Sequence, residues 1–187
     1  MEVRPRSRAD GRRNRELVLS VASKLFVERG PDVPFTDIAR QAGVGVGTVY
    51  RHFPTREELI SAAYASELDA VCQAAGELLA QLPPVAALRK WMNRFIDYMT
   101  TKIGLTDAIR VVVSAGGNPY ARSRERLDEA LGALLAAAVA VGEARPEVEA
   151  DDVLMTLSGI AMAANGSERP DQADRMVELL VAGILVR

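Results

Sequence analysis

The stretch FTDIARQAGVGVGTVYRHF, residues 35–53, decides the fold of this chain. Its apolar residues recur at helical spacing before and after Gly43, which predicts two short helices separated by a turn. Ala39 is small enough to let two helices approach, Gly43 permits the positive φ of a tight turn, and Val49 anchors the second helix in the core. Together these features predict a helix-turn-helix.

The second helix of this stretch is expected to lie in the major groove of DNA, which is about 12 Å wide and admits an α-helix. With Val49 and Phe53 turned inward, the side chains expected to point outward are Val46, Gly47, Thr48, Tyr50, Arg51 and His52. The alternative is that Tyr50 and His52 are ordinary surface residues of a helix. The surrounding pattern favours the DNA-binding interpretation.

Working outward, helical periodicity continues along the chain, so the predicted fold class is all-α with about nine helices. Gly30 is expected to end the first helix, and the capping box at Thr55–Glu58 is expected to start a long fourth helix that Pro83 stops. The predicted helices cover about residues 17–29, 35–42, 46–53, 56–82, 88–103, 107–114, 121–141, 148–164 and 170–185. We expect a helix-turn-helix domain at 1–54, with a basic arm at 1–13, and a second helical domain at 55–187.

Charge is distributed unevenly over the 187 residues. Residues 1–56 contain 11 Lys and Arg against six Asp and Glu, a net charge of +5, whereas residues 57–187 carry a net charge of −7. A basic first third followed by an acidic remainder indicates that the N-terminal part binds a polyanion. The alternative is a basic tail that is merely solvated. The arm from Arg4 to Arg15 either tracks the minor groove or adds nonspecific attraction.

Several classes of protein are excluded by composition. The longest apolar stretch is far shorter than the roughly 20 residues that a membrane span needs, and residues 1–15 contain no apolar signal segment. The single cysteine, Cys72, cannot form an internal disulfide, which fits a reducing cytoplasm. His52 is the only histidine, so hydrolytic zinc sites and Ser-His-Asp triads lack their partners. We therefore expect no enzyme, no metal and no cofactor.

The sequence resembles the tetracycline-repressor (TetR) family of bacterial regulators. The resemblance covers about Leu17 to Leu59 and rests on Leu25-Phe26, Gly30, Asp37-Ile38-Ala39, Ala42-Gly43-Val44, Gly47 to Phe53 and Arg56 to Leu59. Beyond residue 60 it is a likeness of layout, which implies an all-helical effector and dimerisation domain.

The resemblance implies roles for individual residues. Thr48 and Tyr50 are expected to contact phosphate or base edges, His52 to reach a phosphate, and Thr36 to donate to backbone phosphate. Arg56, at the start of the fourth helix, is expected to bind phosphate where the helix dipole adds attraction. Base choice would depend mostly on Val46, Thr48 and Arg51, with Gly47 in the same helix. Pro34 stands where the family often has a Ser or Thr cap, so that contact is expected to be missing.

The last two helices are apolar on two faces, and a helix of this kind needs two partners. We expect them to form a four-helix interface in a two-fold homodimer, against the alternative that both faces are internal. The expected interface residues are Val153, Leu157, Ile160, Met176, Leu180 and Ile184.

The fifth helix carries large side chains opposite Ala-rich helices, a combination that leaves either a cavity or a filled core. Methionines suit adaptable surfaces, and the resemblance places an effector among the fourth to eighth helices. The expected ligand-binding residues are Trp91, Phe95, Met99, Arg110, Ser114, Met155, Ser158 and Met162. Core packing is the alternative for each of them, and Arg110 could instead form a surface pair with Asp107.

These observations predict a cytoplasmic bacterial DNA-binding regulator, associated with the nucleoid. The main hypothesis is a homodimeric repressor that an unknown small-molecule effector releases from a pseudo-palindromic operator. In this hypothesis, the effector tilts the fourth helix and alters the spacing of the two recognition helices. The alternative is a constitutive or architectural DNA-binding dimer with no effector. The expected partners are double-stranded operator DNA, the effector and a second copy of the chain, with no membrane.

Overall fold

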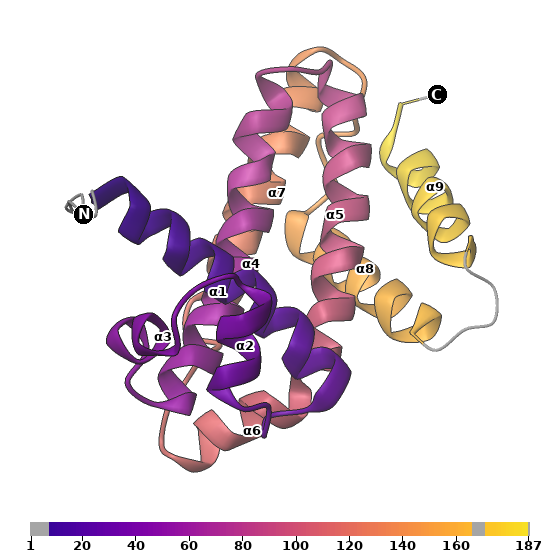
Figure 1. Ribbon diagram of the computed structural model, residues 1–187. Helices are drawn as coiled ribbons and strands as arrows, with labels where there is room; N and C mark the ends of the chain where they lie inside the picture. Colours follow the sequence, from indigo (N-terminus) through magenta and orange to yellow (C-terminus); the bar gives the residue numbers. More distant parts are fainter. Residues whose placement is uncertain (1–7, 166–170, 187) are drawn as a thin grey trace. The chain divides into compact units, whose positions relative to one another are not determined.

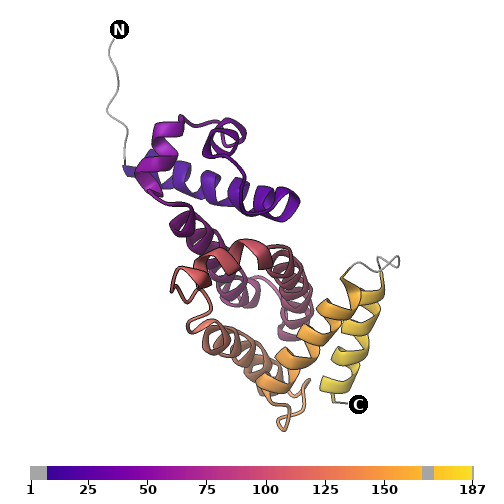
Figure 2. The same cartoon turned by 90° about the horizontal axis from the view of Figure 1, so that it is seen from below.

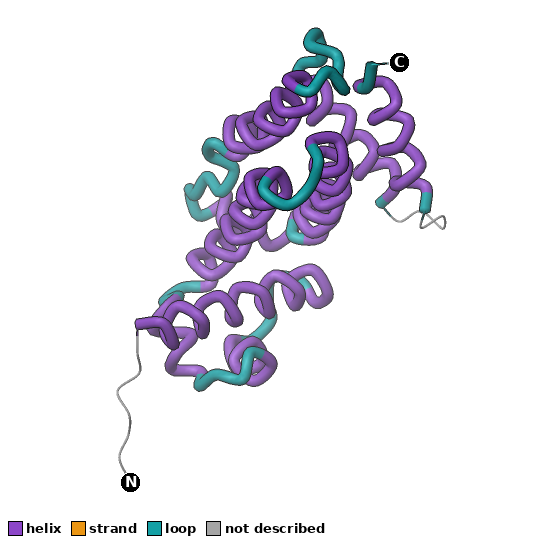
Figure 3. Tube along the Cα trace, turned by 90° about the horizontal axis from the view of Figure 1, so that it is seen from above, coloured by secondary structure: helices purple, strands orange, loops and turns teal. Residues whose placement is uncertain are grey.

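The computed structural model describes residues 8–165 and 171–186. In these residues the chain forms nine α-helices and no strand, so the predicted all-α class is confirmed (Figures 1 and 3). The helices are α1 (Arg8–Arg29), α2 (Phe35–Gln41), α3 (Val46–His52), α4 (Arg56–Leu79), α5 (Pro84–Gly104), α6 (Thr106–Ser114), α7 (Ser123–Ala140), α8 (Ala150–Ala164) and α9 (Gln172–Ile184). The predicted start of the last helix at Pro170 lies outside the described residues.

The turns of the first helices follow the chemistry expected from the sequence. Gly30 has φ +80° and Gly43 has φ +67°, a left-handed conformation that residues with a Cβ rarely adopt. At the start of α4, the amide of Glu58 donates to Oγ1 of Thr55 over 3.2 Å, which is half of the expected capping box. Pro34 occupies the N-cap position of α2 and makes no side-chain cap hydrogen bond.

Contacts divide the chain into two compact units. The first extends up to Ser66 and includes Thr101–Pro119, and the second comprises Glu67–Thr100 and the chain from Tyr120 onward. This division differs from the predicted boundary at residue 54, because the first unit also contains the first half of α4 and all of α6.

The first unit packs α1, α2 and α3 around one apolar core. Val18, Ala22 and Leu25 of α1 are fully buried, as are Ile38 of α2 and Val49 of α3. The helix-turn-helix therefore has the core that the sequence predicted.

The end of α5 also belongs to the first unit and approaches α1 closely. A Cβ at Gly104 would lie 2.7 Å from Cγ1 of Val27. Real Cβ atoms do not come this close to a neighbour, so glycine is required for the present packing of α5 against α1.

The second unit has its core around the indole of Trp91 in α5, which is completely buried. Its Nε1 donates to the carbonyl oxygen of Val71 in α4 over 2.8 Å, and its ring stacks on Phe95 with 5.6 Å between centroids. Nη2 of Arg126 in α7 donates to Oδ1 of Asp69 in α4 over 2.7 Å. These contacts join α4, α5 and α7.

The last two helices lie side by side within the second unit (Figures 1 and 2). The chain end is held by an antiparallel bridge between Ala144 and Leu185, in which the amide of Arg145 donates to Ile184 and the amide of Val186 donates to Glu143. Arg124 of α7 forms an ion pair with Asp151 of α8, and Arg89 of α5 forms one with Glu178 of α9.

In the part of the chain that the structure describes, none of the helices combines the length and the apolar character that crossing a membrane requires.

Candidate nucleic-acid interface

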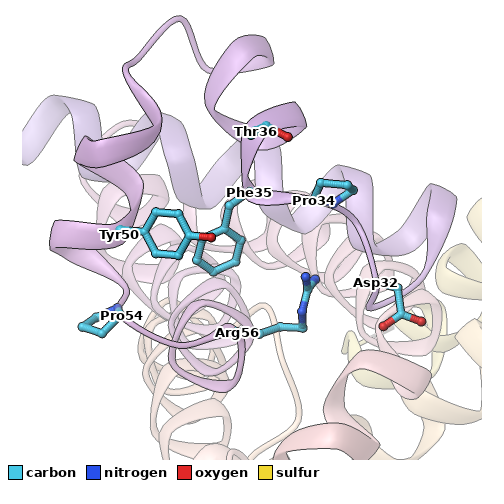
Figure 4. A pocket seen from close by; sticks show the side chains of 7 residues that line it. All are labelled: Asp32, Pro34, Phe35, Thr36, Tyr50, Pro54 and Arg56. Atoms are coloured by element: carbon cyan, nitrogen blue, oxygen red, sulfur yellow. The ribbon is translucent and has the colours of Figure 1, made fainter.

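Tyr50 of α3 is held at the surface by an aromatic contact beneath it. Its ring lies 4.9 Å from the ring of Phe35, centroid to centroid, and the two planes are inclined by 45° (Figure 4). Phe35 is buried, whereas Tyr50 is 54% exposed. A tilted pair at this separation is a favourable aromatic geometry, so α2 fixes the direction in which Tyr50 projects.

Other residues that the sequence assigned to DNA are exposed on the same two helices as Phe35 and Tyr50. Thr36 of α2 and Val46, Gly47 and Arg51 of α3 are exposed, and His52 is partly exposed. Thr36 lines the same depression as Tyr50, and Val46 lies one turn before Tyr50 on the same face of α3. His52 lines a different depression, with Arg15 and Phe53. Donors and apolar groups of this kind are those that contact phosphates and base edges in a groove.

Thr48 is not among these exposed residues, so the prediction that its side chain points outward is wrong. It is 6% exposed, and its Oγ1 accepts a hydrogen bond from Nη2 of Arg51 over 3.1 Å. Nε of Arg51 also donates to the carbonyl oxygen of Gly47 over 3.0 Å. These two hydrogen bonds hold the Arg51 side chain along α3, although the side chain remains exposed.

Arg56 donates hydrogen bonds within the protein through one guanidinium nitrogen. Its Nη1 donates to the carbonyl oxygen of Pro31 and, over 2.8 Å, to that of Val33, both in the loop between α1 and α2. Its guanidinium carbon also lies 5.6 Å from the centroid of the Phe35 ring, at cation–π distance. Figure 4 shows the Phe35 ring with Tyr50 on one side and Arg56 on the other. The sequence pattern does not reveal these partners.

Other basic residues of this unit also have partners. Nη2 of Arg40 and Nη1 of Arg29 lie 2.9 Å and 3.5 Å from the carboxylate of Asp37, and Arg12 lies 3.8 Å from Glu16. The net charge of the first third therefore overstates the number of cations that are free to neutralise phosphate.

The predicted basic arm is partly helical. Residues 8–13 lie within α1, so they form a helical extension instead of an extended arm, and residues 1–7 of the arm lie outside the described residues. Two turns into α1, the guanidinium of Arg15 lies 5.3 Å from the ring centroid of Phe53. This contact joins α1 to the residue that directly follows α3.

The exposed apolar face of α8 and α9 differs from the predicted interface. Val153, Leu157, Ile160 and Ile184 are buried within the protomer, so the prediction that they meet a second copy is wrong, while Met176 and Leu180 are partly exposed. The large apolar side chains that do face outward are Met155, Met162 and Leu179, which are 57%, 68% and 75% exposed. We call these three residues the α8–α9 face.

The candidate ligand residues lie in different environments. Trp91, Phe95 and Met99 are buried in the second unit, whereas Met155 and Met162 are exposed, so the two methionines do not share the buried surroundings of the other three. Arg110 and Ser114 belong to the first unit, where Arg110 pairs with Asp107 over 3.2 Å and Ser114 donates to the carbonyl of Val111. Ser158 donates to the carbonyl of Leu154 in its own helix.

The described residues contain no group of three or more His, Cys, Asp or Glu side chains placed to hold a metal ion. Cys72 is half-buried, and burial raises the pKa of its thiol, with nearby Arg126 partly opposing this effect. A raised pKa disfavours the reactive thiolate.

Comparisons with known proteins agree with this geometry. The family model "Bacterial regulatory proteins, tetR family" matches residues 18–63, and the model "Transcriptional regulator SbtR-like, C-terminal domain" matches residues 83–186. A curated HTH-type transcriptional regulator of Staphylococcus aureus (strain USA300) is 36% identical over 63 residues, which are 33% of this chain and 34% of that protein. The match therefore spans about a third of the curated relative.

Solved structures extend the likeness to the whole fold. A TetR transcriptional regulator of Streptomyces coelicolor is 47% identical, with a TM-score of 0.86 over 91% of this chain and 98% of that one. A TetR regulatory protein of Mycobacterium vanbaalenii is 34% identical, with a TM-score of 0.78 over 96% of this chain and 99% of that one. These relatives are regulators and not enzymes. The chain belongs to the TetR family of bacterial transcriptional regulators.

Proposed function

We propose that this TetR-family regulator is a homodimeric repressor that binds a pseudo-palindromic operator and is released from it by a small effector. The observation that carries the DNA-binding part is the exposed surface around Tyr50, with Thr36 of α2 and Arg51 of α3 beside it. A short helix with exposed donors, backed by a second helix, is the arrangement that helix-turn-helix proteins place in a major groove.

The small size of one such surface is a reason to expect a dimer. One seven-residue helix contacts few base pairs, and two copies related by a two-fold axis double the contacts. The α8–α9 face exposes three large apolar side chains, and small residues lie beside them at Gly159 and Gly183. A second copy that buries this face removes the methionines and Leu179 from water, which favours association. Met176 and Leu180, both partly exposed, would extend the contact.

Effector release is supported by the family alone. We place the effector in the second unit, near Trp91, Phe95 and Met99, where a change of packing would reach α4 through the contact between Trp91 and Val71. To switch the regulator from 1% to 99% in one state, the effector would need to bind that state about 10⁴-fold more tightly. As a DNA-binding protein it would act in the bacterial cytoplasm.

Binding to the DNA upstream of its own gene tests this function. A fluorescence-anisotropy titration should show specific binding that weakens with salt, with a slope of magnitude about 0.9 for each phosphate neutralised. Equal affinity for upstream and scrambled DNA would contradict the proposal. Release is then tested by adding a panel of small apolar metabolites to the protein–DNA complex. If none of the metabolites lowers the affinity for DNA, the alternative of a constitutive DNA-binding dimer is favoured.

The α8–α9 face is tested by a double substitution. Met162→Glu with Leu179→Glu should convert the dimer to a monomer in sedimentation velocity and weaken operator binding, because two buried charges in each protomer would oppose association. Val141→Glu is the matched control, since Val141 is also an exposed apolar residue of the second unit but lies outside this face. A dimer that persists in the double variant would contradict the assigned interface.

A further inference from the structure

We propose that Arg56 is a positioning residue for the recognition helix, and that it acts through Phe35 on Tyr50 instead of binding a phosphate. The inference rests on the proposed DNA-binding function and deepens it. In this proposal, Arg56 of α4 determines the position from which the Tyr50 side chain of α3 contacts DNA.

The guanidinium of Arg56 is held by the loop between α1 and α2. Nη1 of Arg56 donates to the carbonyl oxygens of Pro31 and Val33, and the side chain is only partly exposed. These two bonds engage Nη1 and hold the guanidinium against the α1–α2 loop, so a movement of the whole group toward a phosphate would break them. Hydrogen bonds to charged donors are stronger than neutral ones, so the present geometry favours the internal role.

Ring contacts connect Arg56 to Tyr50 through Phe35. The guanidinium of Arg56 lies 5.6 Å from the centroid of Phe35, whose ring lies 4.9 Å from that of Tyr50. Phe35 is the first residue of α2 and is buried. Arg56 thus holds both the loop that enters α2 and the ring on which Tyr50 leans (Figure 4).

The shape of the arginine side chain suits these contacts. A planar guanidinium can stack on a ring while its N–H groups donate in the plane. A lysine ammonium carries the same charge without that plane, so it cannot satisfy two carbonyls and a ring in the same way. Charge and positioning can therefore be separated by substitution.

The cleft beside these contacts fits the same assignment. Asp32, Pro34, Phe35, Thr36, Tyr50, Pro54 and Arg56 line a depression of about 390 Å³. Its walls come from the α1–α2 loop, α2, α3 and the start of α4, which are the elements that Arg56 links. Loss of the Arg56 contacts would therefore change the shape of this depression and the position of Tyr50, which lines it.

Salt dependence distinguishes positioning from phosphate binding. Arg56→Ala should weaken operator binding about tenfold, from the loss of a cation–π contact and two charge-assisted hydrogen bonds, while the slope of log K against log salt stays at the wild-type value. A phosphate contact would instead lower the magnitude of that slope by about 0.9 in each protomer. Arg56→Lys should lose nearly as much affinity as Arg56→Ala. Near wild-type affinity in Arg56→Lys, or a reduced slope in Arg56→Ala, would overturn the proposal.

Coupling to Tyr50 separates positioning from a general loss of stability. In a double-mutant cycle, Arg56→Ala should cost little affinity once Tyr50→Ala is present, because the side chain being positioned is gone. Equal costs in both backgrounds would contradict the proposal. Arg94→Ala, which removes an exposed arginine of α5 in the second unit, controls for the loss of one positive charge and should leave affinity unchanged.

A measurement on the free protein keeps the two proposals apart. Hydrogen exchange in peptides covering residues 31–38 and 46–53 should be faster in Arg56→Ala than in the wild type, with α7 unaffected. If the wild type binds no DNA specifically but exchange still increases, the proposed function fails, while the structural link from Arg56 to α2 and α3 stands. If exchange and affinity are both unchanged, the positioning role fails.

Discussion

The rings of Phe35 and Tyr50 meet at 4.9 Å with their planes inclined by 45°, and only the tyrosine is exposed. This pair joins the buried start of α2 to the exposed face of α3. The helix-turn-helix therefore presents an aromatic side chain whose direction is set by the core beneath it. About half of the tyrosine side chain is left exposed and available to contact DNA.

Two substitutions at Tyr50 separate the hydroxyl from the ring. Tyr50→Phe keeps the contact with Phe35 and should weaken operator binding by about 1 kcal/mol, the typical value of one hydrogen bond, with an unchanged melting temperature. Tyr50→Ala also removes an aromatic pair worth about 0.5–1.5 kcal/mol, so both affinity and stability should fall. Anisotropy titrations and thermal melts measure the two effects, and wild-type affinity in both variants would rule out a role for Tyr50 at the DNA.

The packing of α5 on α1 predicts opposite effects for two glycines. Gly104→Ala should destabilise the protein by about 1–2 kcal/mol, because its Cβ would lie 2.7 Å from Cγ1 of Val27. Gly76→Ala in α4 is the matched control: no atom lies within 4 Å of its Cβ, and alanine should stabilise the helix by up to about 1 kcal/mol. Urea unfolding measures both, and Val27→Ala should relieve the penalty at Gly104. A penalty that Val27→Ala leaves unchanged would have another cause.

Replacing the buried indole of Trp91 should lower the stability of the fold. Trp91→Phe removes the hydrogen bond to the carbonyl of Val71 and leaves space beside Phe95, so unfolding should become easier by about 2–3 kcal/mol. Denaturant unfolding measures this change. Phe95→Leu, which removes a neighbouring ring without any hydrogen bond, is the comparison. Unchanged stability in Trp91→Phe would mean that the indole is not part of the core.

The carboxyl of Asp97 predicts a pH effect. Partial burial raises its pKa above the usual 3.8, and the nearby carboxylate of Asp174 raises it further. The folded state therefore binds this proton more tightly than the unfolded state, and stability falls as the pH rises through the raised value. Asp97→Asn should stabilise the protein at pH 7 by less than about 1 kcal/mol, since water screens a partly exposed group. Melts from pH 3 to pH 7 should show the gain disappearing in acid, and a gain that is equal at every pH would contradict this cause.

The sequence predicted the turns of the fold because their chemistry is local. Gly43 needs a positive φ, and Thr55 can cap α4 whatever surrounds it. The orientation of Thr48 could not be read in this way. In a helix of seven residues, a small side chain at the edge of the buried face can turn inward or outward, and in this structure Thr48 is buried and hydrogen-bonded to Arg51.

Other errors arose where one pattern fits two structures. α8 is apolar around most of its circumference, so the periodicity could not tell whether Leu157 or Met155 faces the core. Large residues such as Trp91 predict a packed core and a ligand cavity equally well. For Arg56, the deciding groups are carbonyl oxygens more than 20 residues away, which residue types do not disclose.

Hydroxyl-radical footprinting of the DNA upstream of the gene tests the central claim most directly. A dimer whose two α3 helices enter the major groove should protect two half-sites related by a two-fold axis, separated by about 34–36 Å or a whole number of turns. Tyr50→Ala should weaken both protected regions together. Uniform protection without half-sites, or a single protected region that survives Tyr50→Ala, would contradict the account.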